Sequence, residues 1–492
     1  MKKRYLALLI FLCIITFGLF PLDLFVVNVP EPVIYIMLAA VTASAVLLFI
    51  KSGGGMTVKV ISALLAAATV TASVLGITAD PYFNSISLKI TGTAPSQRYD
   101  TVLPADKACE DLDYAMRFLI KDHPALMNGL PEDIQRKYEQ AKADIKAVGS
   151  VTVNELARKT ESIFTMLQDA HTTVFVSDTP LYLKHYYKWK TGGWLLTSLD
   201  GITINELLER SRGLYSFEAD SWLLHSMKND LLDLQGLDYL GFDTEKGVAY
   251  TFENDDGEQL TETYHTDDFV TYAEYLEFNG ITDDTGSSRS FVSFTTDEDR
   301  SLAVLTLSEC IYNSEYINCL REMFNAVKEK GIRNVAVDLR GNGGGNDMTA
   351  VEFIRYLDTD GYSYASEYQR LGVFTTPRSA DRTVNERYSD LTFTGNLYIL
   401  TSSGSFSSAM LFPQYIKDNG LGTLIGEPPG NDPNGYGETA TFTTPNSGIR
   451  FSVSTKRFYR ADKECTDRYV MPDIPCDSSD AIGVLYETIS SR

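Results

Sequence analysis

A short apolar strand that runs directly into a glycine-rich loop is the feature that most constrains this chain. Asn334–Asn346 reads N-V-A-V-D-L-R-G-N-G-G-G-N. Val335 and Val337 are β-branched and two residues apart, which predicts a buried strand. Glycine fills all but one position of Gly341–Gly345, and glycine permits positive φ angles and close approach of a ligand to the backbone. A helix is predicted from near Ala350, so this turn would aim backbone N–H groups at an anion or oxyanion, although a plain tight turn is the alternative.

A serine-rich elbow follows a second predicted strand. Leu397–Leu400 is apolar, and the next segment reads T-S-S-G-S-F-S-S before a mostly apolar helix. A serine at a strand-to-helix turn exposes its hydroxyl beside a free backbone N–H, as in a nucleophile elbow. Serines also cap helices, so the residues alone leave both interpretations open. They do not choose between Ser405, Ser407 and Ser408.

Three motifs, in this order, resemble those of the C-terminal processing (tail-specific) serine peptidases, including their tricorn-core relatives. They are Q-D-A-H-T-T at Gln168–Thr173, V-D-L-R-G-N-G-G-G at Val337–Gly345 and S-F-S-S-A at Ser405–Ala409. Gly426–Gly430 and Met471–Ile474 resemble two further landmarks of the family. The resemblance extends over roughly residues 108–488. It implies a crotonase/ClpP-like α/β core with an N-terminal helical cap, and a protein or peptide as substrate.

The same resemblance implies roles for individual residues. Ser407 corresponds to the nucleophile, because it is the third residue of the family's [S/T]-x-S motif. The backbone N–H groups of Ser408 and of Gly343 or Gly344 would hold the oxyanion. His171 corresponds to the catalytic histidine of tricorn-like relatives.

The chain departs from the better-known members of the family at the catalytic base. Those enzymes use a Ser–Lys dyad, but Gly426–Gly435, where the lysine would lie, contains none. The next lysine is Lys456, beyond another predicted strand. The tricorn-like Ser–His–acid arrangement is therefore expected, with the acid upstream of Pro472-Asp473. Asp467 and Glu464 both lie there, and Asp467 is preferred.

Composition narrows the classes of function. A hydrophobic content of 44% over 492 residues is that of a folded protein with more than one domain. A net charge of −22 argues against nucleic acid as a partner. No H-E-x-x-H motif is present, so no metal or other cofactor is expected. Because the lysine is missing and the acid is not fixed, a catalytically inactive ligand- or peptide-binding protein on the same fold is the alternative function.

Three apolar runs predict a multi-pass membrane anchor over about residues 5–27, 32–50 and 58–79. Each run is close to the roughly 20 residues that a helix needs to cross a bilayer. Lys51 and Lys59 flank the second loop, whereas the first loop carries no Lys or Arg. The positive-inside rule then places everything after Asp80 outside the cytoplasm. A signal peptide followed by a two-helix hairpin gives the same side.

The remainder divides into four predicted segments. Residues 81–105 form a linker, and residues 106–180 a helical cap with apolar residues at helical spacing. Residues 181–299 form a β-rich region in which Leu199–Ile202 resembles part of the family's PDZ module, so a reduced PDZ-like domain is expected. In residues 300–492 strands and helices alternate, as in an α/β peptidase core. Cys310 with Cys319, and Cys465 with Cys476, would form local disulfides in an oxidising compartment, and free thiols are the alternative.

Overall fold

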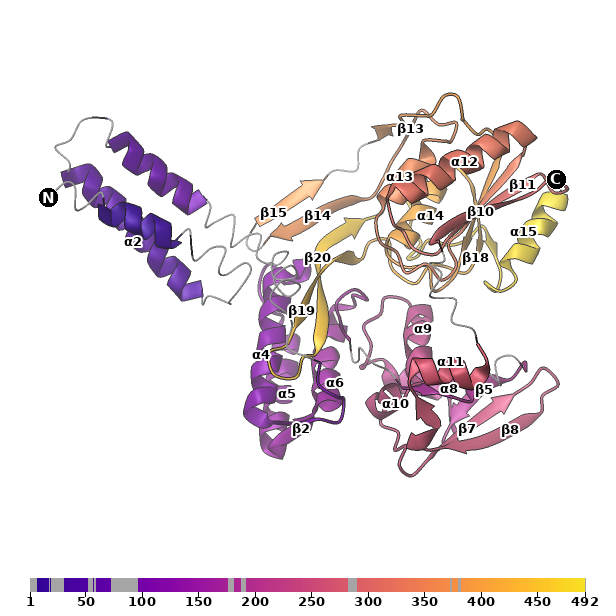
Figure 1. Cartoon of the computed structure of the whole chain (residues 1–492), viewed down its shortest axis with the longest axis horizontal. Helices are drawn as coiled ribbons and strands as arrows, with labels where there is room; N and C mark the ends of the chain where they lie inside the picture. The colour runs from indigo at the N-terminus through magenta and orange to yellow at the C-terminus, as the bar shows by residue number, and fades with distance from the viewer. Residues whose placement is uncertain are drawn as a thin grey trace.

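The protein was analysed as a computed structural model. The structure describes residues 7–16, 18, 31–51, 56, 59–71, 96–175, 181–186, 192–281, 290–371, 374–378 and 382–491. Figure 1 shows an α/β core, a middle domain below it, a helical cap beside the middle domain, and the N-terminal helices on the far side of the cap.

A six-stranded sheet forms the centre of the core, in the order β10-β11-β12-β17-β18-β21. These strands are β10 (Val292–Asp297), β11 (Leu302–Leu307), β12 (Asn334–Asp338), β17 (Asn396–Thr401), β18 (Thr423–Gly426) and β21 (Ile474–Pro475). Only the β10–β11 pair is antiparallel within this sheet. The predicted α/β class is confirmed.

Helices cover both faces of this sheet, which explains why its central strands are apolar without alternation. One face packs against α12 (Ser314–Lys330), α13 (Met348–Ile354) and α14 (Ser408–Asp418), and the other against α15 (Ala481–Ser490). Val335 and Val337 face the first group, and Ala336 between them faces α15. A small pair, β13 (Gly361–Tyr362) with β16 (Thr383–Val384), lies beside the core.

The register of the central strands positions the two motifs that the sequence singled out. β12 pairs in parallel with β17, and Asp338 lies opposite Leu400. Both strands therefore end at the same edge of the sheet, where ligand sites of open α/β sheets lie. The glycine loop follows β12 there, and the serine elbow follows β17.

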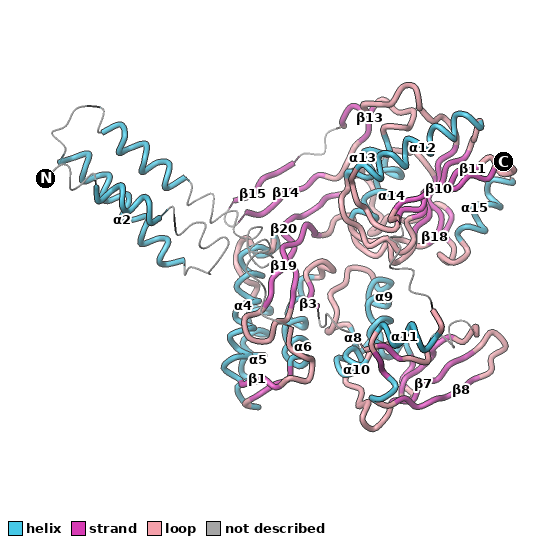
Figure 2. Tube along the Cα trace, viewed as in Figure 1, coloured by secondary structure: helices cyan, strands magenta, loops and turns pink. Residues whose placement is uncertain are grey.

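A second sheet, β15-β14-β20-β19, connects the core to the cap, and β3 adds to β20. Its strands are β3 (Thr173–Phe175), β14 (Ser366–Leu371), β15 (Phe374–Arg378), β19 (Tyr436–Thr443) and β20 (Arg450–Tyr459). In Figure 2, β19 and β20 run from the core down to the cap helices. Phe442 and Phe451 of this hairpin join the apolar core of the cap, and Phe442 stacks on Phe118 at 4.2 Å between ring centroids.

The cap consists of three helices with short connections. They are α4 (Ala105–Asp122), α5 (Glu132–Val148) and α6 (Val153–Phe164), with the pair β1 (Val102–Pro104) and β2 (Ser150–Thr152) and the 3₁₀ turns Pro124–Leu126 and Thr165–Leu167. The first helix stops before Pro124, because proline restricts the residue that precedes it. Thr152 and Glu155 cap α6 reciprocally, each accepting a hydrogen bond from the other's backbone N–H.

The middle domain contains the antiparallel sheet β6-β5-β7-β8. Its strands are β5 (Leu195–Leu199), β6 (Ile202–Thr203), β7 (Val248–Glu253) and β8 (Gln259–Tyr264), with β4 (Tyr182–Leu183) pairing β9 (Phe269–Val270). Its helices are α8 (Ile204–Ser211), α9 (Asp220–Asp230), α10 (Leu234–Leu240) and α11 (Tyr272–Asn279), with a 3₁₀ turn at Thr266–Asp268. This sheet lies within residues 181–299, which the sequence predicts to be β-rich.

The N-terminal region contributes α2 (Glu31–Lys51) and further helical residues at 7–16 and 59–71. Within the described residues, no helix has both the length and the apolar character that crossing a membrane requires. Parts of all three predicted spans lie outside the described residues, as do residues 81–95 of the predicted linker. All six cysteines are described, and all are free thiols.

Asp111 joins the cap to the second sheet, and its loss should destabilise the fold. Its carboxylate is buried and accepts hydrogen bonds from the backbone N–H and side chain of Asn446 and of Ser447, at 2.6 to 2.9 Å. Replacing Asp111 by Ala leaves these donors without an acceptor. We expect a loss of about 3 kcal/mol in the free energy of unfolding, measured by urea denaturation. The exposed Asp106→Ala variant of the same helix should lose less than about 1 kcal/mol, and an equal loss in both would contradict this role.

Candidate active site

Ser407 occupies a strained turn between β17 and α14. Its backbone has φ 57° and ψ −123°, in the left-handed half of conformational space that serine rarely adopts. A hydrogen bond from its backbone N–H to Oδ1 of Asn431, at 2.9 Å, holds this conformation. The Ser407 side chain lines a cleft of about 470 Å³, so the hydroxyl is presented to a ligand. This is the geometry expected of a nucleophile elbow.

The neighbouring serines have structural partners instead. The Ser405 hydroxyl is fully buried and donates to the carbonyl oxygen of Leu339 at 2.8 Å. The Ser408 hydroxyl donates to the carbonyl oxygen of Gly345, also at 2.8 Å. Both bonds tie the elbow to the glycine loop. The structure thereby separates the three serines that the sequence could not rank without the family resemblance.

The glycine loop lies directly against the elbow. Gly344 has φ 102°, and a Cβ atom there would lie 2.7 Å from the Ser407 Cβ and 3.0 Å from the Ser408 backbone nitrogen. The Phe406 backbone N–H donates to the Asn342 carbonyl oxygen at 2.9 Å. Asp338 and Arg340, which precede this loop in the chain, form an ion pair through two hydrogen bonds. Close approach of two backbones is therefore what requires glycine at Gly344.

Two of the predicted oxyanion donors remain suited to that role. The Gly344 N–H already donates to Oδ1 of Asn342 at 2.8 Å, so it is not free to bind an oxyanion. Among the described residues, the N–H of Ser408, the first residue of α14, and that of Gly343 donate to no acceptor. Helix N-termini present such free donors to developing negative charge.

His171 lines the same cleft as Ser407, although 236 residues separate them in the chain. It lies between the last turn of the cap and β3, and its carbonyl oxygen accepts a hydrogen bond from the Ser452 hydroxyl of β20 at 2.6 Å. Its ring packs against Phe406, the residue before Ser407, with 4.4 Å between ring centroids. Burial lowers the pKa of the imidazole below its usual value, against the opposing charge of Asp169. His171 is therefore neutral near pH 7, as a general base must be.

Asp169 is the carboxylate beside His171, and the sequence prediction did not assign it. Its Oδ1 lies 3.8 Å from Nδ1 of His171 and accepts the His171 backbone N–H at 3.0 Å. Nε2 of the buried His123 lies 3.1 Å from the other carboxylate oxygen. Because Nδ1 of His123 accepts the Ala125 N–H, its proton lies on Nε2 and is donated to Asp169. Burial alone would raise the pKa of Asp169, but these bonds and nearby imidazoles outweigh it and lower that pKa.

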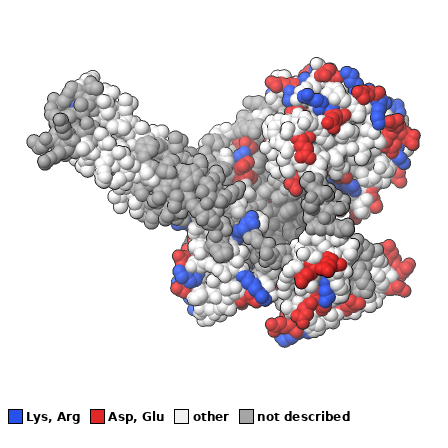
Figure 3. Space-filling model, in the orientation of Figure 1, with Lys and Arg blue, Asp and Glu red and all other residues white. Residues whose placement is uncertain are grey.

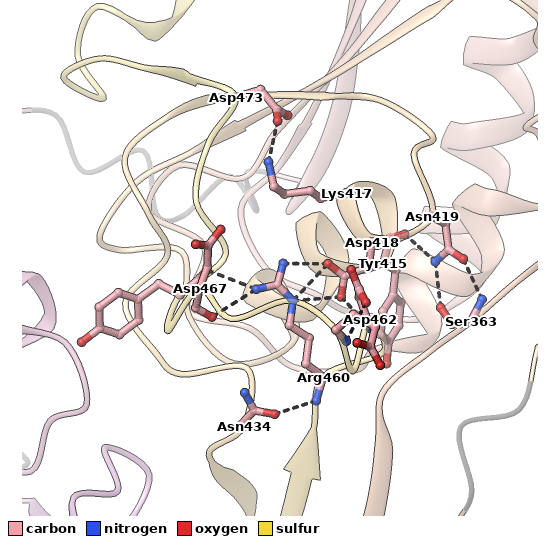
Figure 4. Close-up of polar contacts among 12 residues, drawn as sticks. Ser363, Tyr415, Lys417, Asp418, Asn419, Asn434, Arg460, Asp462, Asp467 and Asp473 are labelled. Atoms are coloured by element: carbon pink, nitrogen blue, oxygen red, sulfur yellow. Dashed lines mark hydrogen bonds and ion pairs between the residues drawn. The ribbon is translucent and has the colours of Figure 1, made fainter.

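The two acids predicted from the sequence do not line the cleft that contains Ser407 and His171. Asp467 and Glu464 are exposed, and neither lines the cleft nor contacts His171 among the described residues. Figure 4 shows the Asp467 backbone oxygen, not its carboxylate, turned toward Arg460. Arg460 in turn forms a buried ion pair with Asp418 at the end of α14, at 2.7 Å. The role predicted for these acids stays a prediction.

Lys456 is a cleft residue that the sequence analysis placed outside the site. It comes from β20, and its ammonium lies 3.4 Å from Glu367 and 3.3 Å from Glu438. Glu218 is a second addition, because Asp169, His171 and Glu218 each offer an atom within 4.8 Å of the others. Asp169 could have been found from its place in the Q-D-A-H-T-T motif, whereas the fold alone brings Lys456 and Glu218 to the site.

Comparison with known proteins identifies the core. Residues 301–476, which include the glycine loop and the serine elbow, match Peptidase family S41. The core of this chain is a peptidase family S41 domain. The chain is accordingly a serine-type peptidase, as its motifs indicated.

Two solved structures, of mature CPAF and of its lactacystin complex, resemble the fold beyond the matched residues. Mature CPAF is 12% identical, with a TM-score of 0.56 over 78% of this chain and 96% of CPAF. Its complex with lactacystin gives a TM-score of 0.55 at 11% identity, over 79% and 97% of the two chains. The photosystem II D1 C-terminal processing protease gives 0.42 at 13% identity, over 75% and 93%. No match was found among curated proteins.

Replacing Gly344 by Ala should disable the peptidase by displacing the elbow. The added methyl group would overlap the Phe406 carbonyl oxygen and the Ser407 side chain. We expect the rate of labelling by a fluorophosphonate probe to fall at least about 100-fold while circular dichroism stays unchanged. The control is Gly483→Ala in α15, where nothing lies within 4 Å of an added Cβ. Undiminished labelling of Gly344→Ala would contradict this account of the loop.

Proposed function

We propose that this peptidase cleaves peptide bonds by a Ser–His–acid mechanism in which Ser407 is the nucleophile and His171 the base. The observation that carries the proposal is that both side chains line one cleft, held there by separate lobes of the fold. Peptidase family S41 membership supplies the substrate class, a protein or peptide.

The first step is attack of the Ser407 hydroxyl oxygen on the scissile carbonyl carbon. His171 accepts the hydroxyl proton as the bond forms, and the carbonyl oxygen becomes an oxyanion. The backbone N–H groups of Gly343 and Ser408 stabilise this charge, each donor being worth about 3–4 kcal/mol of barrier. Collapse expels the amine, which takes the proton from His171 and leaves an acyl-enzyme. Water, deprotonated by His171, then releases the acid product and restores Ser407.

Asp169 is the acid that the geometry favours. Its charge lies beside Nδ1 of His171, so it favours a proton on Nδ1 and leaves Nε2 free to accept the serine proton. It also stabilises the imidazolium that forms during attack. Glu464 and Asp467, the acids expected from the family pattern, are tested beside it.

A Ser–Lys mechanism is the second candidate, because Lys456 lines the same cleft. Its ammonium is already engaged by Glu367 at 3.4 Å and by Glu438 at 3.3 Å. That argument ranks Lys456 below His171. An inactive binding protein on the same fold, the other function left open by the sequence, predicts no turnover at all.

The lobes are further proposed to lie outside the cytoplasm on a multi-pass N-terminal anchor. Support comes from the three apolar runs and from the distribution of Lys and Arg around their loops. In Figure 3 the described atoms of the N-terminal helices are largely white, whereas red and blue side chains cover the core and the middle domain.

The mechanism predicts a specific ranking of variants in a peptidase assay. With the full chain and a fluorogenic peptide library, Ser407→Ala and His171→Ala should each lose at least about 1,000-fold in kcat/KM. Asp169→Asn should lose more than about 100-fold, since it removes the charge beside Nδ1. Glu464→Gln, Asp467→Asn and Lys456→Met should each stay within about threefold of the wild type.

Other rankings would contradict parts of the proposal. A severe loss in Asp467→Asn or Glu464→Gln, with Asp169→Asn active, would move the acid to the family position. A severe loss in Lys456→Met with His171→Ala active would favour the dyad. A folded wild type that cleaves nothing in the library would favour the binding protein.

The anchor predicts how the chain partitions in cells that express it. The full chain should stay with membranes after extraction at high pH and be digested by protease added outside the cytoplasmic membrane. A variant that begins at residue 96 should be released into the soluble fraction. Recovery of the full chain in the soluble fraction, or protection of the lobes from external protease, would contradict the anchor or its orientation.

A further inference from the structure

Glu218 is a buried carboxyl group that the middle domain inserts between the two catalytic segments. It lies two residues before α9, and 4% of its surface is exposed. Oε1 accepts the backbone N–H of Ala170 at 3.3 Å, and Oε2 accepts the backbone N–H of Asp432. Its partners therefore come from the cap and from the core.

Each partner is a chain neighbour of a residue in the proposed site. Ala170 directly precedes His171, so the first bond fixes the backbone that carries the imidazole. Asp432 directly follows Asn431, whose side chain accepts the Ser407 N–H at 2.9 Å. One carboxyl group thus connects the His171 segment with the loop that holds the Ser407 turn.

The Glu218 side chain is enclosed by this loop. A Cβ atom at Gly435 would lie 2.8 and 3.0 Å from the two Glu218 oxygens, so the loop packs closely over the carboxyl group. The carbonyl oxygen of Glu218 accepts hydrogen bonds from the Arg468 side chain at 3.0 Å and from the Tyr469 hydroxyl at 2.9 Å. The residue is therefore fixed at both its backbone and its side chain.

A ring contact close to Glu218 in the chain reinforces the same junction. Trp222 of α9 stacks on Phe406, with 3.9 Å between ring centroids and 15° between planes. Phe406 precedes Ser407 and also packs against His171. The middle domain thus contacts chain neighbours of His171 and Ser407 through the Glu218 carboxyl group and the Trp222 indole.

The direction of the Glu218 pKa shift is consistent with a carboxyl group that acts through hydrogen bonds rather than through charge. Burial and the nearby charge of Asp169 raise the pKa of Glu218 well above its usual value. A protonated Glu218 adds no second negative charge beside Asp169 and His171, yet its oxygens still accept backbone N–H groups.

We propose that Glu218 is a positioning residue for peptide cleavage, contributed by the middle domain, which holds His171 and Ser407 in their catalytic geometry. The inference rests on the Ser407–His171 mechanism proposed above. It gives the middle domain a direct part in turnover, separate from any part in binding substrate.

The test compares kcat, KM and thermal unfolding of the full chain carrying Glu218→Ala, Glu218→Gln or Asp220→Asn. Glu218→Ala should lose about 100-fold in kcat with KM within threefold, because small misplacement of reacting groups slows chemistry. Glu218→Gln keeps one carbonyl acceptor but replaces the other with a donor, so it should recover about tenfold of that loss and stay about tenfold below the wild type in kcat. Asp220 is 65% exposed and pairs with Arg212, so Asp220→Asn should match the wild type.

Several outcomes would overturn the inference. A wild-type kcat in Glu218→Ala, with only a lower melting temperature, would make Glu218 merely structural. If that variant does not fold, a Glu218→Gln variant with unchanged kcat and KM overturns it equally. Inhibition of the wild type by EDTA would make Asp169, His171 and Glu218 metal ligands instead. A wild type without Ser407-dependent turnover would refute the proposed function itself, which is a distinguishable result.

Discussion

The parallel pairing of β12 with β17 is the constraint on which the rest of the structure depends. It brings the glycine loop and the serine elbow to one edge of the sheet, where their backbones meet. Three hydrogen bonds stabilise the positive φ of Ser407: the Ser405 and Ser408 hydroxyls donate to carbonyl oxygens at the glycine loop, and the Ser407 N–H donates to Asn431. The serine is thus presented by rigid elements rather than by a free loop.

The rest of the site is assembled from other lobes. The β19–β20 hairpin reaches the cap, and pairing of β20 with β3 positions the segment that carries His171. The cap itself supplies His123, which orients Asp169, and the middle domain supplies Glu218 and Trp222. Under the proposed mechanism, catalysis therefore requires the three lobes to be docked, and substitutions at their junctions should change kcat.

Much of this arrangement could be read from the sequence because its signals are local. The strands before the two motifs, the cap helices and the stop before Pro124 each follow from apolar spacing or from one residue's conformational limits. The contact between Asp169 and His123 could not be predicted from the sequence. His123 lies 46 residues away, and nothing in its local sequence distinguishes it from a helix-end residue. No local sequence pattern marks Glu218 or Lys456 as a site residue. Tertiary packing brings both of them into the site. Asp467 illustrates the converse, because a motif spacing pointed to a side chain that the fold leaves exposed.

The most direct measurement is tandem mass spectrometry of the full chain after reaction with a fluorophosphonate. The account predicts a single adduct, on Ser407, because among the serines that the structure describes this one alone combines a strained turn with a place in the cleft beside His171. An adduct on Ser405 or Ser408, or a folded chain that forms none, would contradict it.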